Sequence, residues 1–72
     1  MKMIRFIPVN SNNHKKYPPI YINIRYIERI NTYGGRTDLT EVHYRGGYVL
    51  LSGSVDEIAE QIYDSKKNCL NK

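Results

Sequence analysis

The stretch TEVHYRGGYVLLSGSVDEI, residues 40–58, carries the clearest structural pattern in the chain. On each side of Gly46-Gly47, apolar and polar residues alternate, which is the pattern of two antiparallel strands joined by a short turn. A Gly-Gly pair favours a type I′ turn, because that turn needs positive φ at both central positions. With these two glycines as the loop, we expect Tyr44 to pair with Val49.

The two faces of this hairpin differ in chemistry. Apolar and aromatic residues share the face that we expect to line the core, namely Val42, Tyr44, Val49 and Leu51. Residues of mixed type share the opposite face, namely Glu41, His43, Arg45, Tyr48 and Leu50. The alternation therefore predicts a sheet with one buried face and one mixed face, because successive side chains of a strand point to opposite sides.

A helix is predicted to begin directly after the hairpin. Ser54 is its expected N-cap, and Glu57 three residues later completes a capping box. Apolar residues then recur at helical spacing and predict the face that packs on the sheet: Val55, Ile58, Ala59, Ile62 and Tyr63. The same pattern predicts that the helix ends near Lys67 or Asn68.

The residues ahead of the hairpin predict three further strands, at residues 3–9, 20–23 and 27–33. A polar stretch at residues 10–19 is typical of a flexible surface loop, and the Gly pair at 34–35 opens a turn at 34–38. Between the second and third strands, isoleucines recur every three residues. This spacing predicts a tight turn or bulge near residues 23–26, with one helical turn at 24–27 as the alternative.

These elements predict one α+β domain that covers residues 1–72. We expect a small antiparallel β-sheet of four to five strands in meander order, packed against one C-terminal α-helix. A chain of this length buries only about 60% of the surface that its unfolded form exposes, so its core is small. The sheet face that does not pack on the helix is then exposed, or covered by a second copy of the chain.

Composition excludes several classes of protein. Cys69 is the only cysteine, so no disulfide forms within the chain, and His14 and His43 are too few to complete a metal site. The lone cysteine and the lack of a signal peptide favour a reducing cytoplasm. The apolar run at residues 3–7 is too short and too charged to span a membrane. The net charge of +4 permits contact with nucleic acid without requiring it.

The chain carries no recognisable catalytic motif. His43 and Glu41 share a predicted strand face and form a base with an orienting acid, but no motif supplies a nucleophile. Neither glycine pair opens a helix after a strand, as a dinucleotide-binding loop does. We therefore expect a non-enzymatic domain with no catalytic residue, no cofactor, no metal and no small-molecule substrate.

Basic residues and tyrosines are interleaved through the predicted sheet region and the loop at residues 10–19. Such surfaces can stack on bases and contact phosphates. The candidate nucleic-acid-binding residues are Lys15, Lys16, Arg25, Arg29, Arg36 and Arg45. The candidate interaction surface for a protein consists of Tyr21, Tyr26, Tyr48 and Leu50. The ordinary alternative is that tyrosine favours strands, and that arginine stems cover apolar neighbours while their heads stay solvated.

From residue 21 onward, the order of motifs resembles a known family. It runs INIRYIERI, a Gly-containing turn, TEVHY, Gly46-Gly47, YVLL and SVDEI. This order resembles the FlbD/SwrD-like small proteins associated with bacterial flagella, and the likeness covers about two thirds of the chain. The insertion at residues 10–19 and the basic charge depart from that family. The resemblance to this family implies no catalytic residue in the present chain.

Two other resemblances stay open. Residues 24–48 look like the opening half of LytTR-type DNA-binding domains, whose second half is missing here. Small phage and prophage proteins share the same layout. The abundance of Ile, Asn, Lys and Tyr is also typical of AT-rich genomes, which include low-GC bacteria and their phages.

These observations lead to two functional hypotheses. The leading one is a small non-enzymatic interaction module of bacterial or phage origin that binds an unknown protein partner and also itself. The alternative is a nucleic-acid-binding domain that uses a basic and aromatic sheet face together with the loop at residues 10–19. An exposed strand edge favours the first, because its unpaired backbone groups are a ready pairing site.

Overall fold

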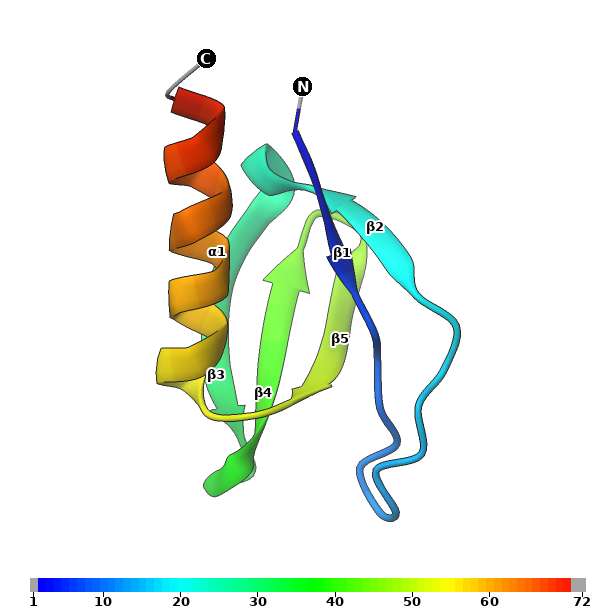
Figure 1. Cartoon of the computed structure of the whole chain (residues 1–72). Helices are drawn as coiled ribbons and strands as arrows, with labels where there is room; N and C mark the ends of the chain where they lie inside the picture. Colours follow the sequence, from blue (N-terminus) through cyan, green and yellow to red (C-terminus); the bar gives the residue numbers. More distant parts are fainter. Residues whose placement is uncertain (1, 71–72) are drawn as a thin grey trace.

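Five strands and one α-helix make up the fold over residues 2–70, the part of the chain that the computed structural model describes (Figure 1). In chain order the elements are β1 (Met3–Phe6), β2 (Ile20–Asn23), the 3₁₀ turn η1 (Ile24–Tyr26), β3 (Ile27–Tyr33), β4 (Arg36–Tyr44), β5 (Gly47–Ser52) and α1 (Val55–Leu70). The predicted α+β class, with antiparallel strands and a C-terminal helix, is confirmed. The strands form two sheets, β1–β2 and β3–β4–β5, where the sequence predicted one.

One turn of 3₁₀-helix, η1, separates the two sheets. Asn23 caps it, because its Oδ1 accepts a hydrogen bond from the Arg25 N–H at 2.9 Å and so turns the backbone. The Ile24 N–H donates to the Lys2 carbonyl at 3.0 Å and ties the turn to the start of β1. The helical turn is therefore the correct alternative at residues 24–27. The irregularity in strand pairing lies one step later, around Glu28 in β3.

The β4–β5 hairpin forms with a different register from the one predicted. Tyr44 pairs with Gly47, so the loop is Arg45-Gly46. Gly46 does not have positive φ, whereas Gly47 does (146°). The prediction of a type I′ turn at these two glycines is therefore wrong. Val49 pairs with Val42 and not with Tyr44. Because this shift is two residues, every side chain keeps its predicted face.

The type I′ geometry occurs at the other glycine pair. Gly34 and Gly35 have φ of 54° and 77° and join β3 to β4, with Tyr33 opposite Arg36. Both glycines therefore adopt the left-handed conformation that this turn requires. The turn predicted at residues 34–38 is shorter than expected, because β4 already begins at Arg36.

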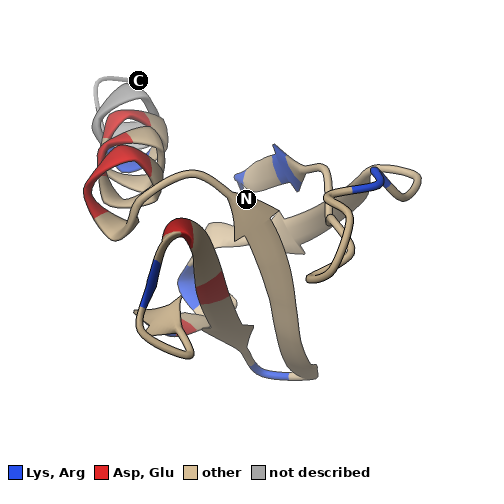
Figure 2. Ribbon diagram, turned by 90° about the horizontal axis from the view of Figure 1, so that it is seen from below, with Lys and Arg blue, Asp and Glu red and all other residues tan. Residues whose placement is uncertain are grey.

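The core lies between the three-stranded sheet and two elements that cover the same face of it. Figures 1 and 2 show α1 and the β1–β2 pair on one side of β3–β4–β5. The buried cluster draws on all of these elements: Ile4, Phe6, Ile22, Ile24, Val42, Leu51, Ile58 and Ile62. Tyr44 and Val49 pack against it, which confirms the predicted core face of the hairpin.

The helix begins as predicted and extends further than predicted. The Ser54 N–H donates to Glu57 Oε1 at 2.8 Å, and the Glu57 N–H donates to Ser54 Oγ at 3.2 Å, which completes the capping box. The helix continues to Leu70, past the end expected near Lys67 or Asn68. Tyr63 was expected on the packed face but is 64% exposed, because Ile58 and Ile62 already fill the contact with the sheet.

The segment at residues 10–19 was predicted to be a flexible loop, but it folds back on itself. β1 ends at Phe6 rather than at residue 9. The Asn10 N–H donates to the Lys15 carbonyl at 2.8 Å, and Val9 and Lys16 form an isolated antiparallel bridge. The Val9 N–H also donates to the Leu50 carbonyl at 3.0 Å, so this segment covers part of the free edge of β5.

The location of the type I′ turn can be tested with two alanine substitutions. An added Cβ at Gly35 would meet no atom within 4 Å, so Gly35→Ala costs backbone strain alone, about 1–2 kcal/mol of unfolding free energy. Gly46→Ala should cost less, because its φ is not positive and its Cβ meets only the edge of the Tyr44 ring, at 3.2 Å. Urea unfolding measures both. Gly35→Asn is the matched control, since asparagine tolerates this conformation; equal losses for both alanine variants would contradict the assignment.

Candidate functional site

The face of β3–β4–β5 that points away from the core carries two rows of side chains across the strands. The first row consists of Arg29, His43 and Tyr48. The second row consists of Asn31, Glu41 and Leu50. We call these six residues the open face. Because α1 and the β1–β2 pair both pack on the opposite side of the sheet, neither of them covers this face.

Side chains of the open face contact one another along and across the strands. His43 Nε2 lies 2.7 Å from Glu41 Oε1, and the His43 ring stacks on Tyr48 with centroids 5.3 Å apart. With the Asn31 amide turned so that its oxygen faces a donor, it accepts a hydrogen bond from Arg29 Nε at 3.2 Å. The open face is therefore ordered before any partner binds.

The pairing of Glu41 with His43 that the sequence suggested does form. It orients the imidazole, as an acid does in a catalytic triad. Among the side chains that the structure describes, no serine, threonine or cysteine is hydrogen-bonded to His43. Glu41 and His43 thus form a pair on the sheet surface, and no described side chain beside them is placed to act as a nucleophile.

A second polar cluster, which the sequence did not predict, joins the start of β4 to the segment at residues 10–19. Arg36 makes two hydrogen bonds to the Asp38 carboxylate, at 2.7 and 3.0 Å, and donates a third to the Ser11 carbonyl at 2.8 Å. His14 Nε2 lies 3.2 Å from both Arg36 Nη2 and Asp38 Oδ2. Its tautomer decides whether this nitrogen accepts from the arginine or donates to the carboxylate. Arg36 and Asp38 are neighbours on one face of β4, and the tertiary fold brings Ser11 and His14 to them.

The ion pair between Arg36 and Asp38 shifts the pKa of both side chains. The hydrogen bonds from Arg36 lower the pKa of Asp38, and the same contact raises the pKa of Arg36. Both side chains are about half exposed, so solvent screens the pair. Arg36 is consequently neutralised by a neighbour, although the sequence made it a candidate for phosphate contact.

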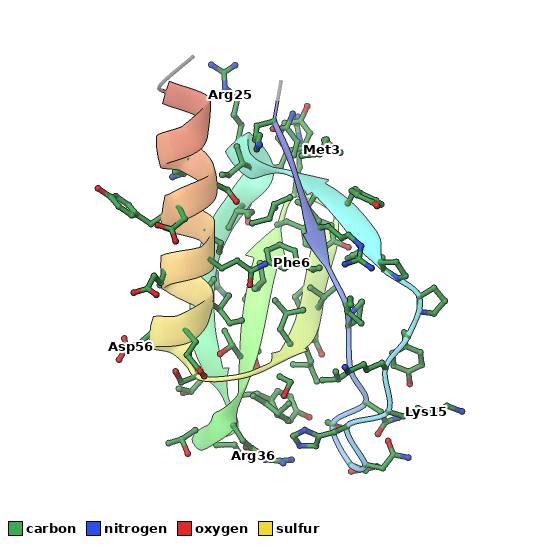
Figure 3. All side chains as sticks on the ribbon, in the orientation of Figure 1. Met3, Phe6, Lys15, Arg25, Arg36 and Asp56 are labelled. Atoms are coloured by element: carbon green, nitrogen blue, oxygen red, sulfur yellow. The ribbon has the colours of Figure 1, made fainter. Side chains whose placement is uncertain are left out.

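The six candidate nucleic-acid-binding residues do not gather on one surface. Lys15 and Lys16 lie in the folded-back segment at residues 10–19, and Figure 3 shows Lys15 and Arg25 at opposite ends of the molecule. Arg29 belongs to the open face, and Arg36 is in its ion pair. Figure 2 shows the Lys and Arg positions spread over the segment at residues 10–19, the sheet and the β4–β5 turn. Arg45 lies in that turn.

The four candidate interaction residues fall on two separate surfaces. Tyr48 and Leu50 belong to the open face. Tyr21 and Tyr26 instead line a hollow of about 420 Å³ together with Arg45, which lies in the β4–β5 turn. The Arg45 guanidinium sits 5.3 Å above the centre of the Tyr26 ring, a cation–π contact.

Comparison with known proteins does not extend this description. No family model, no curated protein and no solved structure matches the chain. The resemblance to the FlbD/SwrD-like and LytTR-type proteins therefore stays a prediction. Within residues 2–70, no cluster of three or more His, Cys, Asp or Glu side chains could hold a metal ion. No helix in this part of the chain is sufficiently long and apolar to cross a membrane.

The Arg36–Asp38 pair makes a pH-dependent contribution to stability. Because the pKa of Asp38 is lower in the folded than in the unfolded chain, the pair stabilises the fold above the ordinary aspartate pKa. That contribution disappears as the pH falls through the lowered pKa. An NMR titration of the Asp38 carboxyl carbon measures this pKa. Arg36→Gln should return it toward about 3.9, whereas Arg29→Gln, outside the cluster, should leave it unchanged; an unaltered pKa in Arg36→Gln would contradict the assignment.

Proposed function

We propose that this chain is a small non-enzymatic interaction module that pairs with a second copy of itself through the open face. The observation that carries the proposal is that the exposed part of the three-stranded sheet lies on the side away from α1 and the β1–β2 pair. Both α1 and the β1–β2 pair contribute to a single buried cluster on one side. On the other side Tyr48 is 55% exposed, and Arg29 and Asn31 are exposed beside it.

The arrangement of the two rows supports a symmetric partner. A two-fold axis that runs across the strands, between the rows, would place each residue opposite its neighbour in the other row of the second copy. Tyr48 would then lie over Leu50, and His43 would lie over Glu41. The first contact is apolar and the second joins a histidine to a carboxylate, so the face is complementary to itself, as an isologous dimer requires.

The size of the core also favours association. The described residues bury ten hydrophobic side chains. The single cysteine of the chain cannot form a disulfide within it. Small domains without disulfides or metals often gain stability from a partner subunit. Two sheets that pack face to face, with strands inclined by about 30°, are a common solution for a sheet with one uncovered side.

Sedimentation equilibrium from micromolar to millimolar concentration tests this proposal. The unaltered chain should show a concentration-dependent dimer. Leu50→Lys should weaken dimerisation roughly tenfold or more, because it places a charge against Tyr48 of the second copy.

Tyr63→Lys is the control, because it places a lysine at another large side chain of the surface, on α1 and away from the open face. It should dimerise like the unaltered chain, and circular dichroism should show that both variants fold. A strict monomer at millimolar concentration would overturn the self-association. Equal weakening by both lysine variants would exclude the open face as the contact.

A further inference from the structure

The hollow beside the β4–β5 turn is built by segments that are far apart in the sequence. Met3 comes from β1, Tyr21 from β2, Tyr26 from η1, and Arg45 from the turn. Figure 3 labels Met3 near the end of the molecule where η1 and this turn lie. The volume of about 420 Å³ lies within the range of small-ligand pockets.

The walls of this hollow expose large aromatic and apolar side chains. Tyr21 is 61% exposed, Tyr26 is 44% exposed, and Met3 is 46% exposed. The apolar residues of a domain this small are needed in its core, so three exposed ones around one concavity point to a ligand. Exposed tyrosine rings in a concave site present flat faces on which another ring can stack.

The charge of the hollow is of one sign. None of its lining residues is acidic. Arg45 makes no ion pair with any side chain that the structure describes, in contrast to Arg36. Its position is held by the Tyr26 ring and by its own backbone N–H, which donates to the Tyr26 carbonyl at 3.1 Å.

A second cation borders the aromatic wall. Arg5 of β1 lies directly opposite Tyr21 of β2, on the face of the β1–β2 pair that also carries Met3. Residues paired in this way have their Cβ atoms within about 5.5 Å. Arg5 therefore lies beside the Tyr21 ring and, like Arg45, makes no ion pair among the residues that the structure describes.

We propose that this hollow binds one nucleotide of a single-stranded nucleic acid. The base stacks on the Tyr21 and Tyr26 rings, and the flanking phosphates contact Arg45 and Arg5. Stacking platforms beside cations are how proteins hold unpaired strands without reading their sequence. A duplex does not suit the site, because its bases are already stacked on one another and are not available to the tyrosines.

This inference goes beyond the proposed self-association and uses a different surface. It also replaces the set of basic residues that the sequence suggested, since of those six only Arg45 lines the hollow. The other contributions come from Arg5 and the two tyrosines. The tertiary structure selects them because it places the β1–β2 pair and η1 next to the β4–β5 turn.

Fluorescence anisotropy with a labelled short oligothymidylate, at low salt and with the full chain, tests the proposal. Tyr21→Ser should weaken binding roughly 5- to 150-fold, the range measured when a stacking ring is removed. Arg45→Gln should also weaken binding and should reduce the slope of log affinity against log salt by about 0.7, because one phosphate contact is lost.

Two exposed residues of α1 supply matched controls. Tyr63→Ser removes an equally exposed tyrosine, and Lys66→Gln removes a cation, both outside the hollow. Neither should change the affinity. Leu50→Lys should also bind the oligonucleotide as well as the unaltered chain does, which separates this site from the dimer contact on the open face.

Three results would overturn the nucleotide site. They are the absence of binding at low salt, equal weakening by Tyr21→Ser and Tyr63→Ser, and binding of a duplex of the same length as tightly as the single strand. An amide NMR titration gives an independent readout that does not depend on the variants. Shifts confined to Met3, Arg5, Tyr21, Tyr26 and Arg45 support the site, and shifts centred on the segment at residues 10–19 exclude it.

Discussion

The packing of two different elements on the same face of one small sheet is the constraint on which the structure depends. Ile58 and Ile62 of α1 and Phe6 of β1 join Val42, which is fully buried in the central strand. Loss of contact with Val42 would leave the helix and the β1–β2 pair without a common surface. Because both elements occupy one side, Tyr48, Arg29 and Asn31 stay exposed on the other side of the sheet, next to the partly buried Glu41–His43 pair.

A second consequence follows from the short 3₁₀ turn at η1. It reverses the chain between β2 and β3, so the β1–β2 pair lies over the sheet and does not extend it. The same turn projects Tyr26 toward Arg45 and so completes one wall of the hollow. The element that divides the fold into two sheets is thus also the element that creates the candidate nucleotide site.

Local signals in the sequence predicted the elements well and their pairing less well. The Ser54–Glu57 capping box and the strand at Ile27–Tyr33 were predictable because each depends on neighbours within a few residues. The type I′ turn was assigned to the wrong glycine pair, because both pairs satisfy the same local rule. Only the packed sheet decides which pair adopts positive φ at both positions.

Alternation and capping depend on adjacent residues, so the class of the fold, the order of the elements and the two chemical faces of the hairpin follow from local patterns. The tertiary structure decided that the strands divide into two sheets and that His14 is brought to the Arg36–Asp38 ion pair of β4. It also decided that Tyr21, Tyr26 and Arg45 share one hollow. The contact between Arg36 and His14 joins residues 22 positions apart, and its geometry follows from how the core packs.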